Sequence, residues 1–166
     1  MDELLDIVDD KDNIAGQEMR STVHQLGLQH RGAHVFLFTR AGKMLVQKRS
    51  ADRAASPSML DCSVSEHVKA GESYFDAALR GMKEEMGVDG IEIDPLVTFR
   101  MNYGINDNEI SRLFKGIVDP ESLQLLENKI GLQQQALPLN ADKPRITAQA
   151  EIEGMKGMAF LDCLRD

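Results

Sequence analysis

Apolar and polar positions alternate in the manner of strands over most of the first two thirds of the chain. "LLDIV" and "IAGQEMR" flank a polar turn and predict a short hairpin, and "AHVFLF" and "MLVQKR" flank a glycine-containing turn and predict a second one. Further strands are predicted in "IEIDPLVTFRMNYG" and "EISRLFKGIVD". Strands are therefore the main elements that the pattern predicts.

One stretch has helical periodicity instead. Ser73, followed three residues later by Asp76, is typical of a helix start, and Gly87 is typical of a helix end. Between them, apolar residues recur at helical spacing and are predicted to face the core: Phe75, Ala78, Leu79, Met82 and Met86. A helix packed on a sheet makes the fold a mixed α/β (α+β) one.

The remaining segments are less regular. Residues 50–61 are small, polar and interrupted by Pro57, which predicts a loop. Pro120 and "ESLQLLENKI" predict a turn leading into a helix, whereas residues 131–166 show little periodicity and stay unassigned. At 166 residues the chain has room for one core, and we expect a single domain over residues 1–166.

Charge and cysteine content narrow the function classes. The chain has 27 acidic and 19 basic residues, a formal charge of -8 that argues against nucleic acid or an anionic membrane surface as a partner. Cys62 and Cys163 lie far apart without metal-ligand spacing, which favours free thiols over a disulfide. The acidic N-terminus lacks the basic start of a signal peptide, and no apolar run approaches the ~18 residues of a membrane span. We expect a cytoplasmic protein.

The predicted helix ends in adjacent carboxylates, Glu84 and Glu85, where the helix dipole disfavours negative charge. A divalent cation such as Mg²⁺ or Mn²⁺ would remove that penalty, because it takes carboxylate oxygens and commonly bridges them to phosphates. Arg80 can lie on the same side of the helix, and Glu72 can reach it from the preceding loop. The alternative is a solvated acidic face balanced by Arg80 and Lys83.

The whole spacing resembles the signature of the Nudix superfamily, Gly-x5-Glu-x7-Arg-Glu-apolar-x-Glu-Glu-x-Gly-apolar. Seven residues stand at matching positions: Glu72, Arg80, Met82, Glu84, Glu85, Gly87 and Val88. Two positions depart from it, with Glu66 in place of the first Gly and Gly81 in place of the Glu after the Arg. The resemblance implies the Nudix fold, a mixed β-sheet sandwiched by helices. In that family the Glu absent at Gly81 helps to bind metal or activate water, so its absence leaves the catalytic base open.

Residues from Leu4 to Val118 also resemble the type 1 isopentenyl diphosphate isomerases and related hydrolase-like Nudix proteins. That family holds a metal among histidines and two acidic residues, and four positions of this chain match: His30, His67, Asp107 and Glu109. His24 lies about one residue from the place of the remaining histidine. The resemblance implies a second divalent metal, for which imidazole and carboxylate suit Mn²⁺, Zn²⁺ or Fe²⁺. His34 we interpret as a packed residue.

The same resemblance assigns substrate contacts and exposes departures. Arg49 and Arg53, with Arg80, are expected to bind the diphosphate, because guanidinium groups bind phosphate oxygens bidentately; the alternative for Arg49 and Arg53 is an ordinary basic strand end. Ser65 stands in place of the catalytic cysteine of the isomerases, and Met101 in place of a tyrosine. A serine is a far poorer proton donor or acceptor than a thiol.

Three functions remain open, all with a small diphosphate as ligand. The first is a Nudix-type hydrolase with Glu84 and Glu85 as the catalytic metal-binding pair, supported by Glu72, and with Glu66, Asp107 or Glu109 as an unranked base. The second is isoprenoid diphosphate isomerisation, with Glu109 and a weakened Ser65, or its neighbour Glu66, as the acid/base pair. The third is a catalytically silent diphosphate-binding module. The exact substrate and the oligomeric state stay undetermined.

Overall fold

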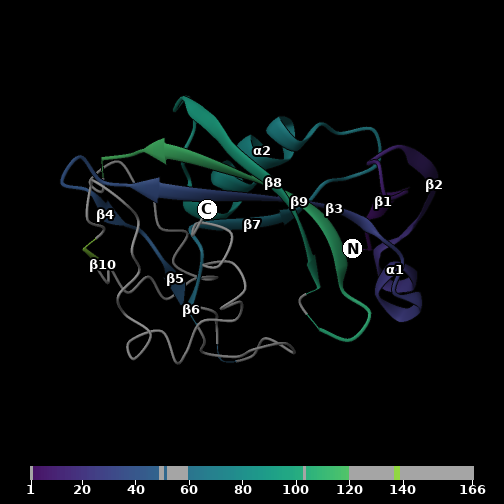
Figure 1. Ribbon diagram of the computed structural model, residues 1–166. Coiled ribbons are helices and arrows are strands. Elements are labelled where there is room, and N and C mark those ends of the chain that lie inside the picture. The colour runs from purple at the N-terminus through teal and green to yellow at the C-terminus, as the bar shows by residue number, and fades with distance from the viewer. Residues whose placement is uncertain (1, 49–50, 52–59, 103, 120–136, 139–166) are drawn as a thin grey trace.

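The structure is a computed structural model, which describes residues 2–48, 51, 60–102, 104–119 and 137–138 (Figure 1). The described elements are β1 (Leu4–Val8), β2 (Ile14–Met19), α1 (Arg20–Leu26), β3 (His30–Phe38), β4 (Lys43–Met44), β5 (Gln47–Lys48), β6 (Leu60–Asp61), β7 (Val64–His67), α2 (Tyr74–Met86), β8 (Ile93–Asn102), β9 (Asn108–Ile117) and β10 (Leu137–Pro138). The predicted helix over 121–130, the segment 131–136 and residues 139–166 lie outside the described residues.

A mixed sheet organises the chain, with β3 as its central strand. β3 runs parallel to β9, from the pair His30 and Glu109 to the pair Phe38 and Ile117. β7 pairs antiparallel with the start of β3, β8 pairs antiparallel with β9, and β4 joins the far end of β3. The parallel pairing brings the starts of two distant strands to the same end of the sheet, where the histidines and carboxylates lie.

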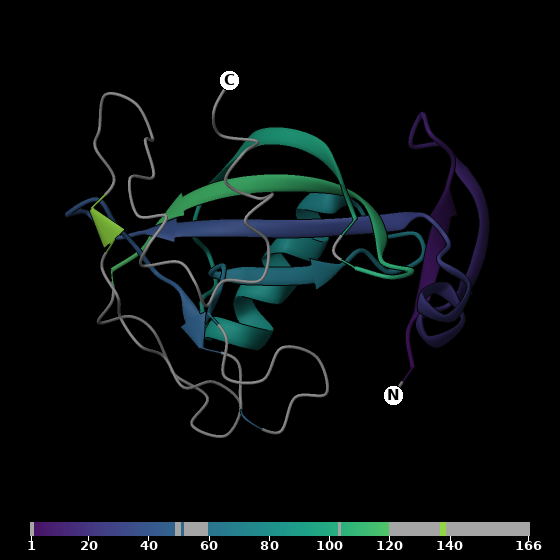
Figure 2. The same ribbon diagram turned by 60° about the horizontal axis from the view of Figure 1, so that its bottom comes forward.

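Helix α2 covers one face of this sheet, as Figure 2 shows. Its start and end are as predicted: the Ser73 hydroxyl accepts from the Asp76 amide at 3.1 Å, and Gly87 adopts the left-handed conformation with a φ of 64°. Met82 and Met86 are buried as expected. The prediction for Phe75 was wrong, because this side chain is 45% exposed and its neighbour Tyr74 takes the buried place.

Two apolar clusters lie on opposite faces of the sheet. Alternate residues of β3, including Ala33, Val35 and Leu37, pack against α2 together with Val64 of β7. The intervening residues point to the opposite face, where Phe36 packs with Leu113 and with other buried side chains. Each position on β3, β7 and β9 is thereby assigned to one face.

The first hairpin, β1 and β2, forms as predicted and stands at one end of the sheet with α1 (Figure 2). Helix α1 was not predicted, because it has only seven residues and buries a single side chain, Val23, which leaves too few apolar positions to reveal a period. Strand β7 was also missed, since it is only four residues long.

The second predicted hairpin is interrupted. "MLVQKR" was predicted as one strand, but the structure has β4 and β5 separated at Leu45–Val46, with β5 paired to β6 instead of β3. Leu45 and Val46 are buried, one in each apolar cluster, so side-chain packing determines the path of the backbone here. Within the described residues, no helix is long and apolar enough to cross a membrane.

Candidate functional site

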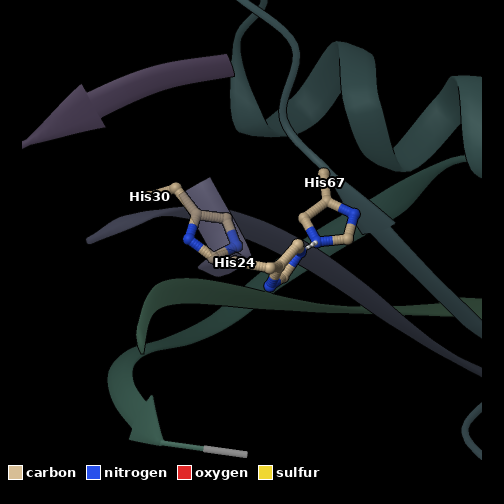
Figure 3. Close-up of side chains that lie close together, drawn as sticks. All are labelled: His24, His30 and His67. Carbon is tan, nitrogen blue, oxygen red and sulfur yellow. Dashed lines mark hydrogen bonds between the residues drawn. The ribbon is translucent and has the colours of Figure 1, made fainter. Parts of the chain in front are cut away.

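Three histidines from three elements meet at the end of the sheet where β3 begins. His24 comes from α1, His30 is the first residue of β3, and His67 is the last residue of β7 (Figure 3). The Nε2 atoms of His24 and His67 are 3.1 Å apart, and the three ring centroids are separated by 5.0 to 5.2 Å. His30 and His67, which the resemblance assigns to a metal site, therefore lie together, and His24 joins them.

Two carboxylates complete this group, which we call the histidine cluster: His24, His30, His67, Asp107 and Glu109. Glu109 approaches His30 at 3.6 Å and His67 at 3.9 Å, and Asp107 approaches His24 at 3.4 Å. The ligand atoms of His24, His30 and His67 lie within 4.8 Å of one another, as do those of His30, Asp107 and Glu109. All five predicted residues are brought together.

The loop between β8 and β9 positions Asp107 by capping α1. The Asn106 side chain donates to the Gln25 carbonyl at 3.0 Å, and the Asn108 side chain donates to the Gly27 carbonyl at 2.9 Å. These carbonyls belong to the end of α1, which has free acceptors at that end. Docking this loop on α1 places Asp107 next to His24.

Glycine at position 32 makes room for Glu109. A Cβ built on Gly32 would lie 2.1 Å from a Glu109 carboxylate oxygen, so no larger residue fits there with Glu109 in place. The same oxygen accepts from the Ser111 hydroxyl at 2.9 Å and lies 3.6 Å from His34. His34 was interpreted as a packed residue, and it is buried; strand alternation places it on the same face as His30, where it contacts Glu109.

The electrostatics of the histidine cluster suit a divalent cation. Burial opposes ionisation of Glu109, but the contacts with His30 and His34 outweigh it and hold its pKa well below the usual range. Burial lowers the pKa of His67 to about 3, so its imidazole is a neutral ligand. The Nε2 atom of His30 is fully buried without a hydrogen-bond partner among the described residues. Burial lowers the pKa of His24 as well, whereas at His30 burial is outweighed by the contact with Glu109, which raises the pKa. Imidazole nitrogens and an ionised carboxylate are ligand types that suit Mn²⁺, Zn²⁺ or Fe²⁺.

A second group lies on the opposite face, against α2. Arg80 donates from Nε to Glu72 at 2.9 Å, from Nη1 to Glu66 at 2.9 Å and more weakly to Glu84 at 3.4 Å, and from Nη2 to the His67 carbonyl at 2.8 Å. Both oxygens of Glu72 are engaged, one by Arg80 and the other by Arg80 and the Lys69 amide. Arg80 thus ties the helix to β7 and to the loop before α2.

Glu84 and Glu85 diverge, although we expected both to share one side with Arg80. Glu84 is 56% exposed and pairs with Arg80, whereas Glu85 turns towards the sheet and accepts from the Gln47 side chain. Burial, and then a hydrogen bond with Glu66, raise the pKa of Glu85 to about 9. Glu66 of β7, Glu72 of the preceding loop, and Glu84 and Glu85 of α2 all lie near this helix, and we call the four of them the helix carboxylates. Gln47 was not foreseen, because it lies in a segment predicted only as strand.

The other predicted residues divide between the faces. Ser65 lies opposite His34 on β7 and is exposed, on the face of the histidine cluster. Met101 pairs with Glu109 and is buried in the apolar cluster of that face. Glu66, by alternation, points to the other face, so its predicted role as a substitute for Ser65 in the isomerase reading does not fit the geometry. Arg49 and Arg53 lie outside the described residues.

Comparison with known proteins identifies a family and several relatives of this chain. The NUDIX domain family matches residues 28–140. An uncharacterized Nudix hydrolase of Streptomyces coelicolor is 42% identical over 54% of this chain and 50% of its own length. An isopentenyl-diphosphate Delta-isomerase of Serratia proteamaculans is 32% identical over 72% of this chain and 68% of its own length. The chain thus spans about half the length of the first of these relatives.

The fold also has solved counterparts. The crystal structure of DR0079 from Deinococcus radiodurans superimposes with a TM-score of 0.76 over 99% of this chain and 100% of that one, at 24% identity. A MutT/nudix family protein from Enterococcus faecalis has a TM-score of 0.55 over 66% of this chain and 44% of that one, at 18% identity. At these identities the likeness concerns the fold alone.

Proposed function

This chain belongs to the Nudix family, and from that we propose that it is a metal-dependent hydrolase that cleaves the phosphoanhydride bond of a small diphosphate. The observation that supports this most directly is the position of Glu85. Its carboxyl group is turned into the protein at the C-terminal end of α2, next to another carboxyl group, where both the helix dipole and the neighbour disfavour negative charge. A carboxylate at such a place is explained when a cation binds there.

The donors around Glu85 fit a hard cation. Three of the helix carboxylates, Glu66, Glu72 and Glu84, pair with Arg80, and all the acidic ligand atoms are oxygens, which Mg²⁺ and Mn²⁺ prefer. Glu85 would hold the ion, and Glu84, which pairs with Arg80 in this structure, would have to turn to join it. Glu72 keeps Arg80 in place. When bound, the cation supplies neutralisation of the diphosphate oxygens and of the leaving group.

Hydrolysis then requires one proton transfer. Water forms a new bond to phosphorus while the bond from phosphorus to the bridging oxygen breaks. The electron pair of the broken bond leaves with the departing phosphate. The proton of the attacking water passes to a carboxylate of the site. Arg49 and Arg53, taken from the sequence resemblance, would bind the diphosphate oxygens. Arg80 was predicted to join them, but its guanidinium is engaged by Glu66, Glu72, Glu84 and the His67 carbonyl, so its role is to position these groups.

The histidine cluster supports a second candidate, isoprenoid diphosphate isomerisation. His24, His30, His67, Asp107 and Glu109 converge, and Ser65 lies on the same face. In this reaction Glu109 would move one proton and Ser65 the other. Ser65 is the weaker partner because a hydroxyl near neutral pH exchanges protons far less readily than a thiol.

A single assay separates the two candidates. The protein is incubated with Mg²⁺ or Mn²⁺ and either a panel of nucleoside diphosphates and their derivatives or isopentenyl diphosphate, and the products are identified by mass. We expect phosphate or a nucleoside monophosphate product with at least one member of the panel. An isomer of unchanged mass from isopentenyl diphosphate would favour the second candidate, and unchanged substrates in every mixture would refute both.

A further inference from the structure

The two departures from the Nudix pattern, Glu66 and Gly81, meet in space. A Cβ built on Gly81 would lie 2.5 Å from the Cγ of Glu66 and 2.6 Å from Cγ1 of Val64. Real Cβ atoms do not approach other carbons so closely, so a larger residue at position 81 and the present Glu66 side chain exclude each other. The glycine on the helix is what lets a strand side chain lie across it.

Glu66 brings a carboxylate into this space. It points from β7 towards α2, where it accepts from Arg80 Nη1 at 2.9 Å and lies close enough to Glu85 to raise the pKa of that carboxyl group. Its side chain is 17% exposed, so solvent reaches it only in part. A residue at position 81 of α2 would direct its own side chain to the same place, because Gly81 is buried against β7.

We propose that Glu66 supplies, from strand β7, the carboxylate that the Nudix pattern carries at position 81, and that Glu66 and Glu85 together bind the divalent cation of the hydrolase. The proposal rests on the proposed function and adds a ligand to it. The two departures are then one exchange: the acidic residue has moved from the helix to the strand that faces it.

The geometry favours Glu66 over the other candidate carboxylates. Glu109 is held by His30, His34 and Ser111 on the opposite face of the sheet, and Asp107 lies there next to His24. Only Glu66 of the three lies against α2. Among the residues that the structure describes, Arg80 contacts the other helix carboxylates, whereas the polar neighbours of Glu85 include Gln47, Glu66 and Asp61. Within the described residues Arg80 pairs with Glu66 but not with Glu85, so a bound cation would supply the positive charge that an ionised Glu85 needs.

The first test measures binding of Mg²⁺ alone, followed as the rise in Tm with increasing Mg²⁺. Mg²⁺ prefers oxygen ligands, so the imidazoles of the histidine cluster contribute little to this signal. We expect Glu66→Gln, which keeps the size of the side chain, and Glu85→Gln each to weaken Mg²⁺ binding ~10- to 100-fold. Asp89→Asn is the control, because Asp89 is an exposed carboxylate just beyond α2 that pairs with Lys83. It should keep the wild-type response.

The second test moves the carboxylate back to the helix. Glu66→Gly removes it, and Gly81→Glu restores it from α2, with Val64→Ala to relieve the other close contact. We expect the triple variant to recover at least ~10-fold in Mg²⁺ affinity over the Val64→Ala/Glu66→Gly double variant, and to recover turnover of the diphosphate found in the panel. If the triple variant does not fold, the Glu66→Gln measurement decides.

The outcomes separate this proposal from the function on which it rests. If Glu66→Gln keeps the wild-type Mg²⁺ response while Glu85→Gln loses it, the role of Glu66 is refuted and the hydrolase proposal stands. If the wild type turns over no diphosphate but Glu66→Gln still loses Mg²⁺ binding, the hydrolase proposal fails and Glu66 remains a ligand. If neither variant changes the Mg²⁺ response, both are refuted.

Discussion

Replacing Glu85 by Gln should stabilise the metal-free protein. Gln has the size of a protonated Glu and can still accept from Gln47, but it cannot become negative next to Glu66. The pKa of Glu85 is raised from an ordinary 4.5 to about 9, by burial and then by Glu66. Between these two pH values the folded protein holds a proton that the unfolded chain has lost, so its free energy of unfolding falls as the pH rises.

The size of the effect follows from that shift. At pH 7, which is 2.5 units above the ordinary value of 4.5, a full shift would cost about 3 kcal/mol, at 1.36 kcal/mol per unit. Glu85 is only half-buried, so solvent screening reduces this cost. We expect Glu85→Gln to raise the free energy of unfolding by about 1 to 3 kcal/mol. This corresponds to a rise of roughly 2 to 10 °C in Tm. The gain should be small near pH 5 and largest near pH 9.

The assay is thermal and denaturant unfolding in EDTA at several pH values, with Glu84→Gln as the matched control. Glu84 is the adjacent carboxylate on the same helix, but it is 56% exposed, so its replacement should change the free energy of unfolding by no more than ~0.5 kcal/mol and without a trend in pH. Adding Mg²⁺ should make the wild type more stable than Glu85→Gln, since this variant lacks a cation ligand. Equal behaviour of the two variants in EDTA, or a gain that does not depend on pH, would refute the raised pKa of Glu85. An unchanged order in Mg²⁺ would refute its assignment as a cation ligand.

Three further predictions concern the opposite face. Ser65→Cys should raise any isomerisation of isopentenyl diphosphate by ~10²-fold or more, as a competent acid/base group does; a folded, metal-loaded variant without any gain would count against the isomerase candidate. Gly32→Ala should lower the free energy of unfolding by about 1 to 3 kcal/mol in chemical denaturation, because its Cβ would lie 2.1 Å from a Glu109 oxygen; an unchanged value would show that Glu109 can move aside freely. Removal of divalent metal with a chelator should lower Tm of the wild type more than that of His67→Ala, which lacks a ligand of the histidine cluster, and equal shifts would mean that no metal is bound there.

The sequence by itself determined the local elements and the chemical classes of the site. Helix α2 could be predicted because Ser73 and Gly87 act through the backbone of their own neighbours, and Met82 and Met86 recur at the helical period. The hairpin β1–β2 and the long strands β8 and β9 could be predicted because apolar and polar residues alternate along them, which is also a local property of the sequence. Short elements such as α1 and β7 could not be predicted, since so few residues show no detectable period.

Which residues face each other was decided only by the tertiary structure. Glu84 and Glu85 are equivalent in sequence, yet packing of α2 on β7 turns one to solvent and the other towards Glu66. Glu66 and His67 are neighbours in sequence, but strand alternation sends them to opposite faces of the sheet. The parallel pairing of β3 with β9 places His30 beside Glu109, which lies 79 residues later in the sequence. Contacts of this kind depend on register and burial, which no single segment encodes, and this is why Glu66 and Gly81 first read as two separate departures.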